Sequence, residues 1–358
     1  MLDIATDGIR GVWVAHGRNG RPHGAVADHM EKDAGVDIIE VDRLVKRYGS
    51  FIAVDGVSFT VREGELFGFL GPNGAGKSTT ISVLCTLLRP TEGRVLVNGY
   101  DVASDPDGVR RSIGIIFQDP SLDTQLTAME NLAFHARVYH LPRSYWNAEA
   151  ERLLRLVDLW ERRDDLVKNF SGGMKRRLEI ARGLLHRPRV LFLDEPTLGL
   201  DPQTRDHIWT YLEQIRRDTG TTLFLTTHYM EEAERCDRIA IIDHGHIVAL
   251  DTPDALKGMV GGDIITLTTG DDDRAAAVLQ ERFGLRAAQV DSTLRLEVQN
   301  GEAMIPRIIQ GIDVPIRTVS LRRPSLEDVF LKITGREMRQ EEVSEVDRMR
   351  EHVRAGRG

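Results

Sequence analysis

The sequence predicts an α/β protein built on a parallel sheet, and three apolar runs support this fold class. Residues 66–70 are wholly apolar and precede a glycine-rich stretch and a helical pattern at 79–88. Residues 190–193 are also apolar and precede Asp194 and Glu195, while 222–226 form a third short run. Strands buried on both faces read as continuous segments of this kind. Because parallel strands end at a common edge of their sheet, we expect the polar residues after these runs to lie together.

The glycine-rich stretch at 71–79 predicts a site for a nucleoside triphosphate. It fits G-x-x-x-x-G-K-[ST] and stands between a strand and a helix, the context that this pattern requires. Glycines let backbone N–H groups close around phosphate oxygens at the positive end of the helix. The lysine is placed to reach the terminal phosphates and the serine to hold magnesium. A tight turn that binds nothing is the alternative. We expect nucleotide contacts from Gly71, Pro72, Asn73, Gly74, Ala75, Gly76, Lys77, Ser78 and Thr79.

Composition limits the broader class of protein. At 358 residues, with 41% hydrophobic and 28% charged residues, the chain is long enough for two ordinary globular domains. The formal net charge of -8 weighs against nucleic-acid binding, which usually requires a basic domain. Cys85 and Cys236 lack metal-type spacing, so we expect buried free thiols in a reducing compartment. We expect neither a signal peptide nor a membrane helix, so another chain would have to supply any membrane part.

The N-terminal part predicts an extension followed by an antiparallel region. Residues 1–35 show no sustained periodicity and favour a disordered extension, although the apolar cluster at 12–14 would also allow docking onto a partner. Residues 36–41 read as a strand, and 53–61 alternate like an antiparallel strand. Tyr48 lies between them, either to stack on a purine base or as an ordinary half-buried aromatic residue. The dipeptides Asn98-Gly99 and His244-Gly245 predict tight turns between strands.

A second candidate anion site lies within a helical region. Gln118 stands at the exit of the apolar strand 113–117, where it can ligate a metal ion or merely end the strand. Residues 127–185 then become helical, which predicts a helical subdomain inserted between two core strands. Ser171 is a good N-cap, and Gly172 and Gly173 expose the next N–H groups. This arrangement is either an anion site or a plain helix cap.

Further polar residues follow the core strands. Asp194 is placed to hold magnesium, and Glu195 to polarise an attacking water as general base. Paired acids at a strand end can also be merely solubilising. Asp201 is the predicted N-cap of a helix that begins at Pro202. His228 follows the run at 222–226, where it is placed to bond the terminal phosphate or is incidental.

The order of these motifs resembles the nucleotide-binding domain of ATP-binding-cassette (ABC) transporters. The motifs in order are Tyr48, GPNGAGKST, Gln118, SGGMK, VLFLDEP, LGLD ending at Asp201, and His228. The resemblance covers residues 36–255 and implies a phosphate-loop NTPase core with an antiparallel β subdomain and a helical subdomain. Phe170 and Met174 depart from the family pattern, which usually has Leu and Gln at these positions. Phe170 keeps an apolar side chain.

The resemblance also implies a role for each matched residue. The phosphate loop would cradle ATP with Lys77 on the terminal phosphates, and Tyr48 would stack on adenine. Magnesium would be ligated by Ser78 and Gln118 and supported by Asp194. Glu195 would activate water, and His228 would contact the terminal phosphate. Members of the family sandwich two ATP molecules head to tail, so one cassette implies a homodimer or a paired cassette chain. Ser171 and Gly173 would complete the site of the second subunit, and Gly172 and Asp201 are also expected to bind nucleotide.

The sequence divides into four expected segments: the extension 1–35, a nucleotide-binding domain at 36–258, a C-terminal domain at 263–335 and a charged tail at 336–358. The C-terminal domain reads as strand, helix, two strands, helix and strand, which predicts a small ferredoxin-like α+β unit. Its last helix is stopped by Gly335. This ending, from Pro324 onward, resembles that of daunorubicin-resistance-type ATPases. Sodium, polysaccharide and lipid exporter subunits have similar endings.

We therefore expect an ATPase subunit at the cytoplasmic face of the cell membrane, which drives export of a drug- or antibiotic-like substrate through a separate permease. One alternative is an exporter of sodium, lipid or polysaccharide. Another is a soluble cassette ATPase that acts on ribosomes or DNA, but the single phosphate loop and the lack of a coiled-coil or zinc insertion argue against it. An inactive cassette conflicts with the presence of Lys77, Asp194, Glu195 and His228.

Overall fold

The computed structural model describes residues 36–290 and 293–335. The extension 1–35 and the tail 336–358 lie outside the described residues. The chain divides into two compact units, with the division between Leu250 and Asp251. Helix α8 (Pro253–Val260) belongs to the second unit, where it packs against α11 (Leu326–Thr334). For this reason the division falls before residue 258.

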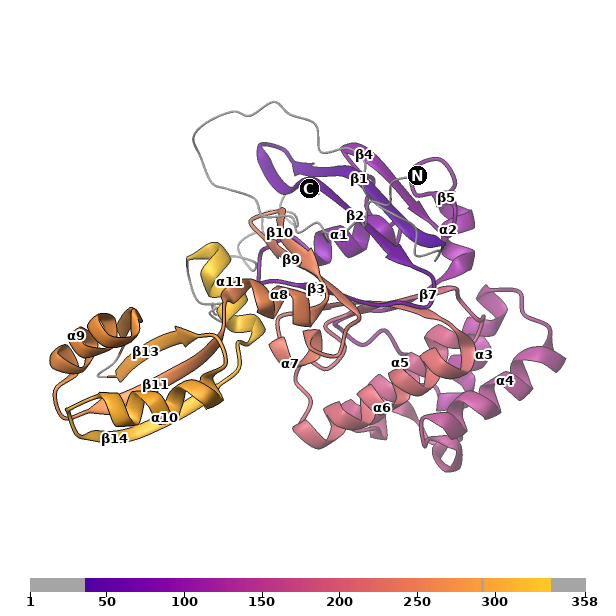
Figure 1. The fold of residues 1–358 in the computed structure, drawn as a ribbon. Coiled ribbons are helices and arrows are strands. Elements are labelled where there is room, and N and C mark those ends of the chain that lie inside the picture. The colour runs from indigo at the N-terminus through magenta and orange to yellow at the C-terminus, as the bar shows by residue number, and fades with distance from the viewer. Residues whose placement is uncertain (1–35, 291–292, 336–358) are drawn as a thin grey trace, which may run out of the picture. The chain divides into compact units, whose positions relative to one another are not determined.

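A six-stranded sheet forms the core of the first unit, with the order β10-β9-β3-β8-β7-β6 (Figure 1). The neighbours from β6 to β9 pair in parallel. Every residue of β3, β7 and β8 is buried, as continuous apolar runs predict. The parallel α/β core is thus confirmed. The strands are β3 (Leu66–Leu70), β6 (Ile113–Ile116), β7 (Val190–Asp194), β8 (Thr222–Thr227), β9 (Arg238–Asp243) and β10 (His246–Asp251).

A second, antiparallel sheet has the order β2-β1-β4-β5. Its strands are β1 (Asp37–Tyr48), β2 (Phe51–Arg62), β4 (Glu92–Val97) and β5 (Tyr100–Asp101). Both predicted turn dipeptides have positive φ at two successive residues, 50° and 78° at Asn98-Gly99 and 46° and 79° at His244-Gly245. Such turns match the twist of a hairpin, so they link β4 to β5 and β9 to β10 tightly.

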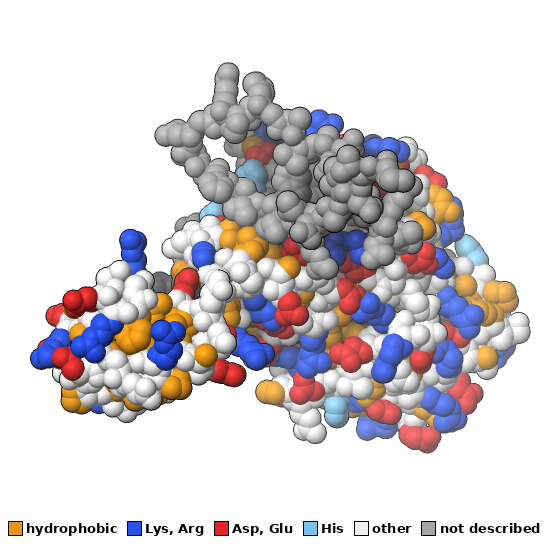
Figure 2. Space-filling view, viewed as in Figure 1, with side chains coloured by type: hydrophobic (Ala, Val, Ile, Leu, Met, Phe, Trp, Pro, Cys, Tyr) orange, Lys and Arg blue, Asp and Glu red, His pale blue; other side chains and the backbone are white. Residues whose placement is uncertain are grey.

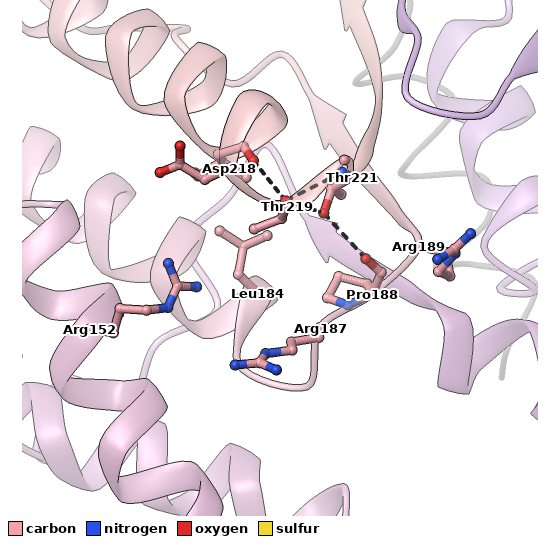
Figure 3. A pocket seen from close by; sticks show the side chains of 10 residues that line it. Arg152, Leu184, Arg187, Pro188, Arg189, Asp218, Thr219 and Thr221 are labelled. Atoms are coloured by element: carbon pink, nitrogen blue, oxygen red, sulfur yellow. Dashed lines mark hydrogen bonds between the residues drawn. The ribbon is translucent and has the colours of Figure 1, made fainter.

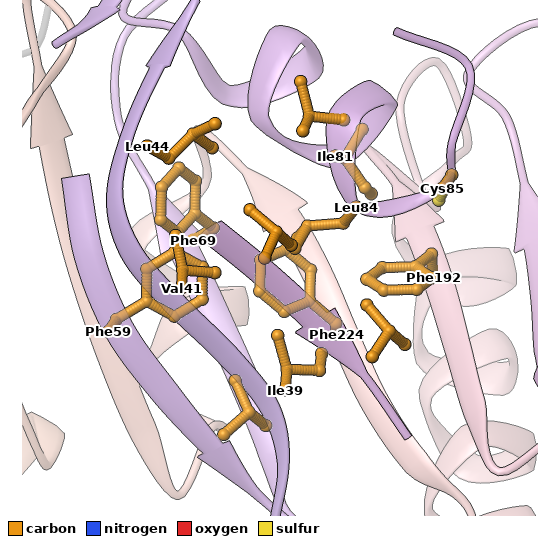
Figure 4. Close-up of a cluster of buried hydrophobic side chains, with 14 of the residues drawn as sticks. Ile39, Val41, Leu44, Phe59, Phe69, Ile81, Leu84, Cys85, Phe192 and Phe224 are labelled. Carbon is orange, nitrogen blue, oxygen red and sulfur yellow. The ribbon is translucent and has the colours of Figure 1, made fainter. Parts of the chain in front are cut away.

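A cluster of aromatic rings joins the two sheets. Phe59 of β2 stacks on Phe67 of β3 with ring centroids 5.5 Å apart, and Phe224 of β8 lies 5.4 Å from Phe192 of β7. Figure 4 shows Phe59, Phe192 and Phe224 of this cluster, together with Ile81 of helix α1 (Lys77–Leu84). Because this packing surrounds β3, it fixes both ends of the phosphate loop.

Helix α1 is shorter than predicted. The expected range was 79–88, but the helix begins at Lys77 and ends at Leu84. Thr86 has a φ of 62°, which a right-handed helix cannot accommodate. Leu87, which lies within the predicted range, is 54% exposed. The prediction was wrong at this end, because the leucine spacing continues the helical period into a turn.

The helical subdomain lies between β6 and β7, as predicted. Its helices are α3 (Ala128–Val138), α4 (Arg143–Leu156) and α5 (Gly172–Leu184). Thr127 begins α3 with a reciprocal capping box to Glu130. Leu153 and Leu154 of α4 are fully buried, so this helix packs within the subdomain through its leucines. Helix α2 (Pro106–Ser112) precedes β6, while α6 (Pro202–Thr219) and α7 (Met230–Ala233) follow β7 and β8.

The second unit has the predicted ferredoxin-like order of elements. Its antiparallel sheet runs β12-β13-β11-β14, so the first and third strands in sequence lie at its centre. Buried side chains of β11 and β13 pack with Leu279 of α9 and Ile308 of α10. The elements are β11 (Asp263–Thr269), α9 (Asp272–Phe283), β12 (Ala287–Val290), β13 (Thr293–Val298), α10 (Gly301–Gly311) and β14 (Ile316–Arg322).

The ending that resembled daunorubicin-resistance-type ATPases forms a strongly capped helix. Ser325 caps α11, its hydroxyl accepts from the Asp328 amide, and the Asp328 carboxylate accepts from the Ser325 amide. Arg295 of β13 and Arg322 of β14 both donate to the same carboxylate. Gly335 ends the helix with a φ of 72°. The Ser-x-x-Asp part of this motif therefore fastens the last helix to the sheet.

Candidate active site

The phosphate loop leaves β3 and enters α1 through glycines that are needed for steric reasons. Gly76 has a φ of 108°, and a Cβ there would lie 2.6 Å from the carbonyl oxygen of Ala53. A Cβ at Gly71 would lie 2.4 Å from the carbonyl oxygen of Ile242. By contrast, Gly74 faces open space. The loop is therefore anchored at both ends, while its middle is accessible to a ligand.

Lys77 is buried at the base of this loop, with 5% of its surface exposed. Its Nζ donates to the carbonyl oxygens of Gly71 at 2.8 Å and Pro72 at 3.1 Å, and lies 3.4 Å from Glu195 Oε1. Burial lowers the pKa of Lys77, although the nearby Glu195 carboxylate opposes this shift. The loop thus places a concentrated positive charge where phosphate oxygens would lie.

Asp194, the last residue of β7, faces two hydroxyl groups. Its Oδ1 accepts from Thr226 Oγ1 at 2.5 Å and from Ser78 Oγ at 3.4 Å. Burial raises the pKa of Asp194; the Thr226 hydrogen bond opposes the shift and the neighbouring Glu195 adds to it. A carboxylate and a serine hydroxyl side by side are hard oxygen donors that suit Mg²⁺. The residues present therefore fit a magnesium ion.

Glu195 follows β7 in an unusual backbone conformation, with a φ of 46°. Non-glycine residues in the left-handed region cost about 1–2 kcal/mol, so the surroundings must hold this one in place. Its amide donates to Thr226 Oγ1 at 3.1 Å, and its Oε1 lies 3.2 Å from His228 Nδ1. Burial would raise the pKa of Glu195, but the bond to His228 and the charge of Lys77 outweigh it and lower that pKa. Glu195 is thus kept ionised.

Arg176 of α5 holds the backbone of these acids and uses all five of its N–H donors. Nε donates to the Pro196 carbonyl at 2.6 Å, and Nη2 to the carbonyls of Asp194 at 3.2 Å and Glu195 at 3.3 Å. Nη1 donates to Glu179 at 3.2 Å and to the carbonyl of Phe117. We did not predict a role for Arg176, because basic residues in an amphipathic helix usually form its solvated face.

Tyr48 meets the phosphate loop at the end of β1. Burial raises the pKa of its hydroxyl, and a hydrogen bond with the Thr79 side chain opposes the shift. Tyr48 as a whole is 40% exposed, and Lys46 Nζ lies 5.3 Å from the centroid of its ring. An accessible ring face beside the loop is compatible with stacking on a base.

The second candidate anion site forms around the start of α5. Ser171 caps this helix, with its hydroxyl accepting from the Met174 amide at 3.2 Å. A Cβ at Gly173 would lie 2.5 Å from Thr204 Cγ2, and Thr204 Oγ1 donates to Asp201 at 2.7 Å. Within the described residues, no hydrogen bond or ion pair joins Ser171 or Gly173 to the Lys77 cluster. Among the described residues, the two candidate anion sites of one chain thus share no hydrogen bond or ion pair.

Gln118 differs from the other candidates. Strand β6 ends at Ile116, so Gln118 lies two residues beyond it and is exposed. In the part of the chain that the structure describes, no hydrogen bond joins its side chain to Ser78 or Asp194. The structure thus gathers Lys77, Ser78, Asp194, Glu195 and His228, and leaves Gln118 outside this group.

A cavity of about 510 Å³ lies at the opposite edge of the sheet, between residues that precede β7 and β8 (Figure 3). Pro188, Arg189 and Thr221 line it, with Arg187 at its rim. The charge of Arg187 is balanced by Glu149 at 2.8 Å, and Arg189 pairs with Glu63. Arg152 also lines the cavity and shares Glu149 with Arg187, at 2.7 Å. The cavity is thus lined by three arginines, and none of its lining residues belongs to the candidate active site.

Comparison with known proteins is consistent with this geometry. Residues 54–198 match the family described as ABC transporter, and residues 252–334 match the ATP-binding protein DrrA1-3-like C-terminal domain. The chain is 40% identical over 315 residues to the daunorubicin resistance ATP-binding protein DrrA3 of Streptomyces coeruleorubidus, covering 86% of this chain and 98% of that protein. It is 38% identical to the linearmycin resistance ATP-binding protein LnrL of Bacillus subtilis, covering 84% and 100%.

Solved structures are similar to about three fifths of this chain. One is an ATP-binding subunit of an ABC transporter, with a TM-score of 0.57 and 33% identity over 62% of this chain and 92% of that one. Another is a dimeric ATP-binding cassette in a post-hydrolysis state with ADP and phosphate bound, with a TM-score of 0.55 and 27% identity over 60% and 98%. Among residues 36–290 and 293–335, no helix combines the length and apolar character needed to cross a bilayer. The chain belongs to the ATP-binding subunits of ABC transporters, and within them to the members with a DrrA1-3-like C-terminal domain.

Proposed function

We propose that this chain hydrolyses MgATP to drive export of a drug- or antibiotic-like compound through a separate membrane permease. The observation that carries the proposal is that Glu195 Oε1 lies 3.4 Å from Lys77 Nζ and 3.2 Å from His228 Nδ1. Relatives of almost the full length of the chain include daunorubicin and linearmycin resistance proteins. One relative at 38% identity is a Nod factor export protein of Ralstonia nicotianae, so the transported compound depends on the permease.

The phosphate loop and its lysine would bind the triphosphate. Lys77 would exchange its bonds to the Gly71 and Pro72 carbonyls for bonds to terminal phosphate oxygens, which match its charge better. Ser78 and Asp194 would hold Mg²⁺, and the bound ion would neutralise the charge that develops on the phosphates. Tyr48 would stack on adenine. Gln118 would complete the magnesium site only after a change in the loop after β6, because its side chain is outside the cluster here.

Glu195 would act as general base. Its lowered pKa keeps it ionised at neutral pH, which a group that must accept a proton from water requires. As the water oxygen bonds to the terminal phosphorus, Glu195 takes a water proton and the bond to the ADP oxygen breaks. His228, 3.2 Å from the Glu195 carboxylate, would orient it and contact the terminal phosphate.

Two cassettes would form one working unit. Because the Ser171–Gly173 site is separate from the Lys77 cluster of its own chain, it is free to meet the nucleotide of a second cassette, with Asp201 beside it. The dimeric cassette with ADP and phosphate supports this arrangement for the family. We propose a homodimer or a paired cassette chain that closes on ATP, and a permease that responds to the closed state.

The permease would dock on the helical subdomain at the cytoplasmic face of the cell membrane. Phe134 and Val138 of α3 are 63% and 57% exposed and lie one helical turn apart, so they present an apolar patch to solvent. Phe117, beside Gln118, is also exposed. On the face drawn in Figure 2, acidic and basic side chains are interspersed.

The test compares wild type, Glu195→Gln and Phe134→Ala. Purified wild type should hydrolyse ATP, whereas Glu195→Gln should lose hydrolysis but form dimers with MgATP by light scattering. In cells with the cognate permease, Phe134→Ala should lose drug efflux while its isolated ATPase rate stays normal. Phe51→Ala serves as the control, because Phe51 is an exposed phenylalanine at the start of β2. Normal hydrolysis by Glu195→Gln would refute the base assignment, and normal efflux by Phe134→Ala would refute the docking patch.

A further inference from the structure

Glu232 is a buried carboxylate that none of the proposed steps uses. It lies on the short helix α7 after His228, and only 1% of its surface is exposed. A buried carboxylate is costly unless its oxygens accept hydrogen bonds. The partners of Glu232 therefore indicate why it occupies this position.

Each oxygen of Glu232 accepts from a threonine of a different segment. Oε2 accepts from Thr227 Oγ1 at 2.6 Å, and Oε1 accepts from Thr197 Oγ1. Both threonines are buried, at 1% and 0% exposure. Thr227 directly precedes His228, and Thr197 lies two residues after Glu195. The carboxylate thus connects the segment of the proposed base to the segment of the histidine that contacts it.

Backbone hydrogen bonds extend this connection on both sides. The Leu198 amide donates to the Glu195 carbonyl at 3.2 Å, and the Leu200 amide to the Thr197 carbonyl at 3.1 Å, so the path continues to the cap at Asp201. On the other side, the Gly71 amide donates to the Thr227 carbonyl at 3.3 Å. Glu232 is therefore in contact with one threonine linked to the phosphate loop and another linked to the turn at Asp201.

We propose that Glu232 is a positioning residue for ATP hydrolysis, which holds residues 195–201 and 227–229 in one arrangement. The proposal rests on the roles proposed above for Glu195 and His228. Arg176, on α5, donates to the backbone carbonyls of residues 194–196. Glu232, on α7, accepts from Thr197, the residue that follows them. With the backbone fixed on two sides, Glu195 keeps its left-handed conformation and its 3.2 Å contact with His228.

The threonines offer matched variants. Thr197→Val removes the hydroxyl at nearly constant volume, whereas Thr197→Ser keeps it. Glu232→Gln replaces one acceptor oxygen by a donor, and Glu231→Gln makes the same change at an 89% exposed neighbour. Misplacing a catalytic group by about 1 Å, or removing a partner that orients it, costs about 10- to 100-fold in rate. We expect Glu232→Gln and Thr197→Val to lower kcat by about this factor.

The experiment measures kcat, the Kd for ATP and amide hydrogen exchange in the full chain. Glu232→Gln and Thr197→Val should lower kcat while the Kd for ATP stays within about twofold of wild type. Thr197→Ser and Glu231→Gln should hydrolyse ATP at near-normal rates. The Glu232→Gln/Thr197→Val double variant should be no slower than the slower of the two single variants. The proposal also predicts faster amide exchange at 197–201 and 227–229 in Glu232→Gln. Unchanged kcat in Glu232→Gln and Thr197→Val would overturn it, as would parallel loss of ATP binding and thermal stability. The effect of Glu232→Gln on amide exchange is also measured in the Glu195→Gln background. Exchange reports on the position of the backbone and not on proton transfer, so this comparison distinguishes an incorrect base assignment from an incorrect role for Glu232.

Discussion

Replacing Asp328 by Asn should loosen the C-terminal unit selectively. The carboxylate is 6% exposed and accepts from Arg295, from two nitrogens of Arg322 and from the amide and hydroxyl of Ser325. Asparagine keeps the shape but loses the charge, and places an amide donor against arginine donors. Because the arginines are 28% and 45% exposed, we assign about 1 kcal/mol to each of the two ion pairs. We count no loss for the cap, because the backbone amide at position 328 still donates to the Ser325 hydroxyl and asparagine keeps one acceptor oxygen.

The expected loss is therefore about 2 kcal/mol in the free energy of unfolding of this unit. For a domain of under 100 residues, this corresponds to a fall of about 8 °C or more in its Tm. Residues 251–338 contain no tryptophan, so fluorescence would not report on them. Hydrogen exchange of peptides from β11, β13 and β14, measured in the full chain against denaturant, gives the unfolding free energy directly. Glu327→Gln, an exposed neighbour on the same helix, is the control.

The pH dependence adds a second check on the same variant. Burial would raise the pKa of Asp328, but the bonds from Arg322, Ser325 and Arg295 outweigh it and hold that pKa far below its usual range. A carboxylate with a depressed pKa stabilises the fold above its unfolded pKa of about 3.9, and this contribution is lost as pH falls toward the folded pKa. The difference in unfolding free energy between wild type and variant should thus have its full value above about pH 5 and shrink below about pH 4. A variant within about 0.5 kcal/mol of the Glu327→Gln control at pH 7 would refute the stabilising role assigned to this carboxylate.

Three further predictions concern the first unit. Asp194→Asn should abolish MgATP hydrolysis. It should also raise the Tm of the nucleotide-free protein at neutral pH by about 2–4 °C, because an acid whose pKa is raised by burial stabilises the fold only when protonated. A lower Tm in thermal scans would contradict this. Gly76→Ala should abolish ATP binding in a nucleotide-titration assay, since its Cβ would meet the Ala53 carbonyl at 2.6 Å. Gly68→Ala should destabilise the chain by about 1–3 kcal/mol, because its Cβ would lie 2.8 Å from Cys236 Sγ. Adding Cys236→Ala should recover part of that loss in denaturant titrations, and no recovery would count against the predicted clash.

The sequence alone was sufficient to predict features that depend on local spacing. The phosphate loop is recognisable because strand, glycines, lysine and helix are contiguous, so backbone geometry and ligand chemistry are encoded in nine residues, 71–79. The buried strands are recognisable because a parallel strand covered on both faces must be apolar throughout. The C-terminal unit followed from alternation in its strands and helical spacing between them. Local patterning was less reliable at element ends, as shown by Leu87, where the helical period continues beyond the helix.

The tertiary structure decided which distant side chains meet. Ser78 and Asp194 are 116 positions apart, and Arg176 reaches Phe117 across 59 positions, so no local pattern encodes these contacts. Glu232 and Arg176 sit in short amphipathic segments where a charged residue ordinarily faces solvent, and only packing shows that they are buried and bonded to the segment 194–197. Gln118 shows the converse, because a residue at the end of a core strand is carried outside the cluster by the loop that follows. Local spacing thus determined which residues can bind phosphate, while long-range packing determined how the residues around the proposed catalytic carboxylate are held.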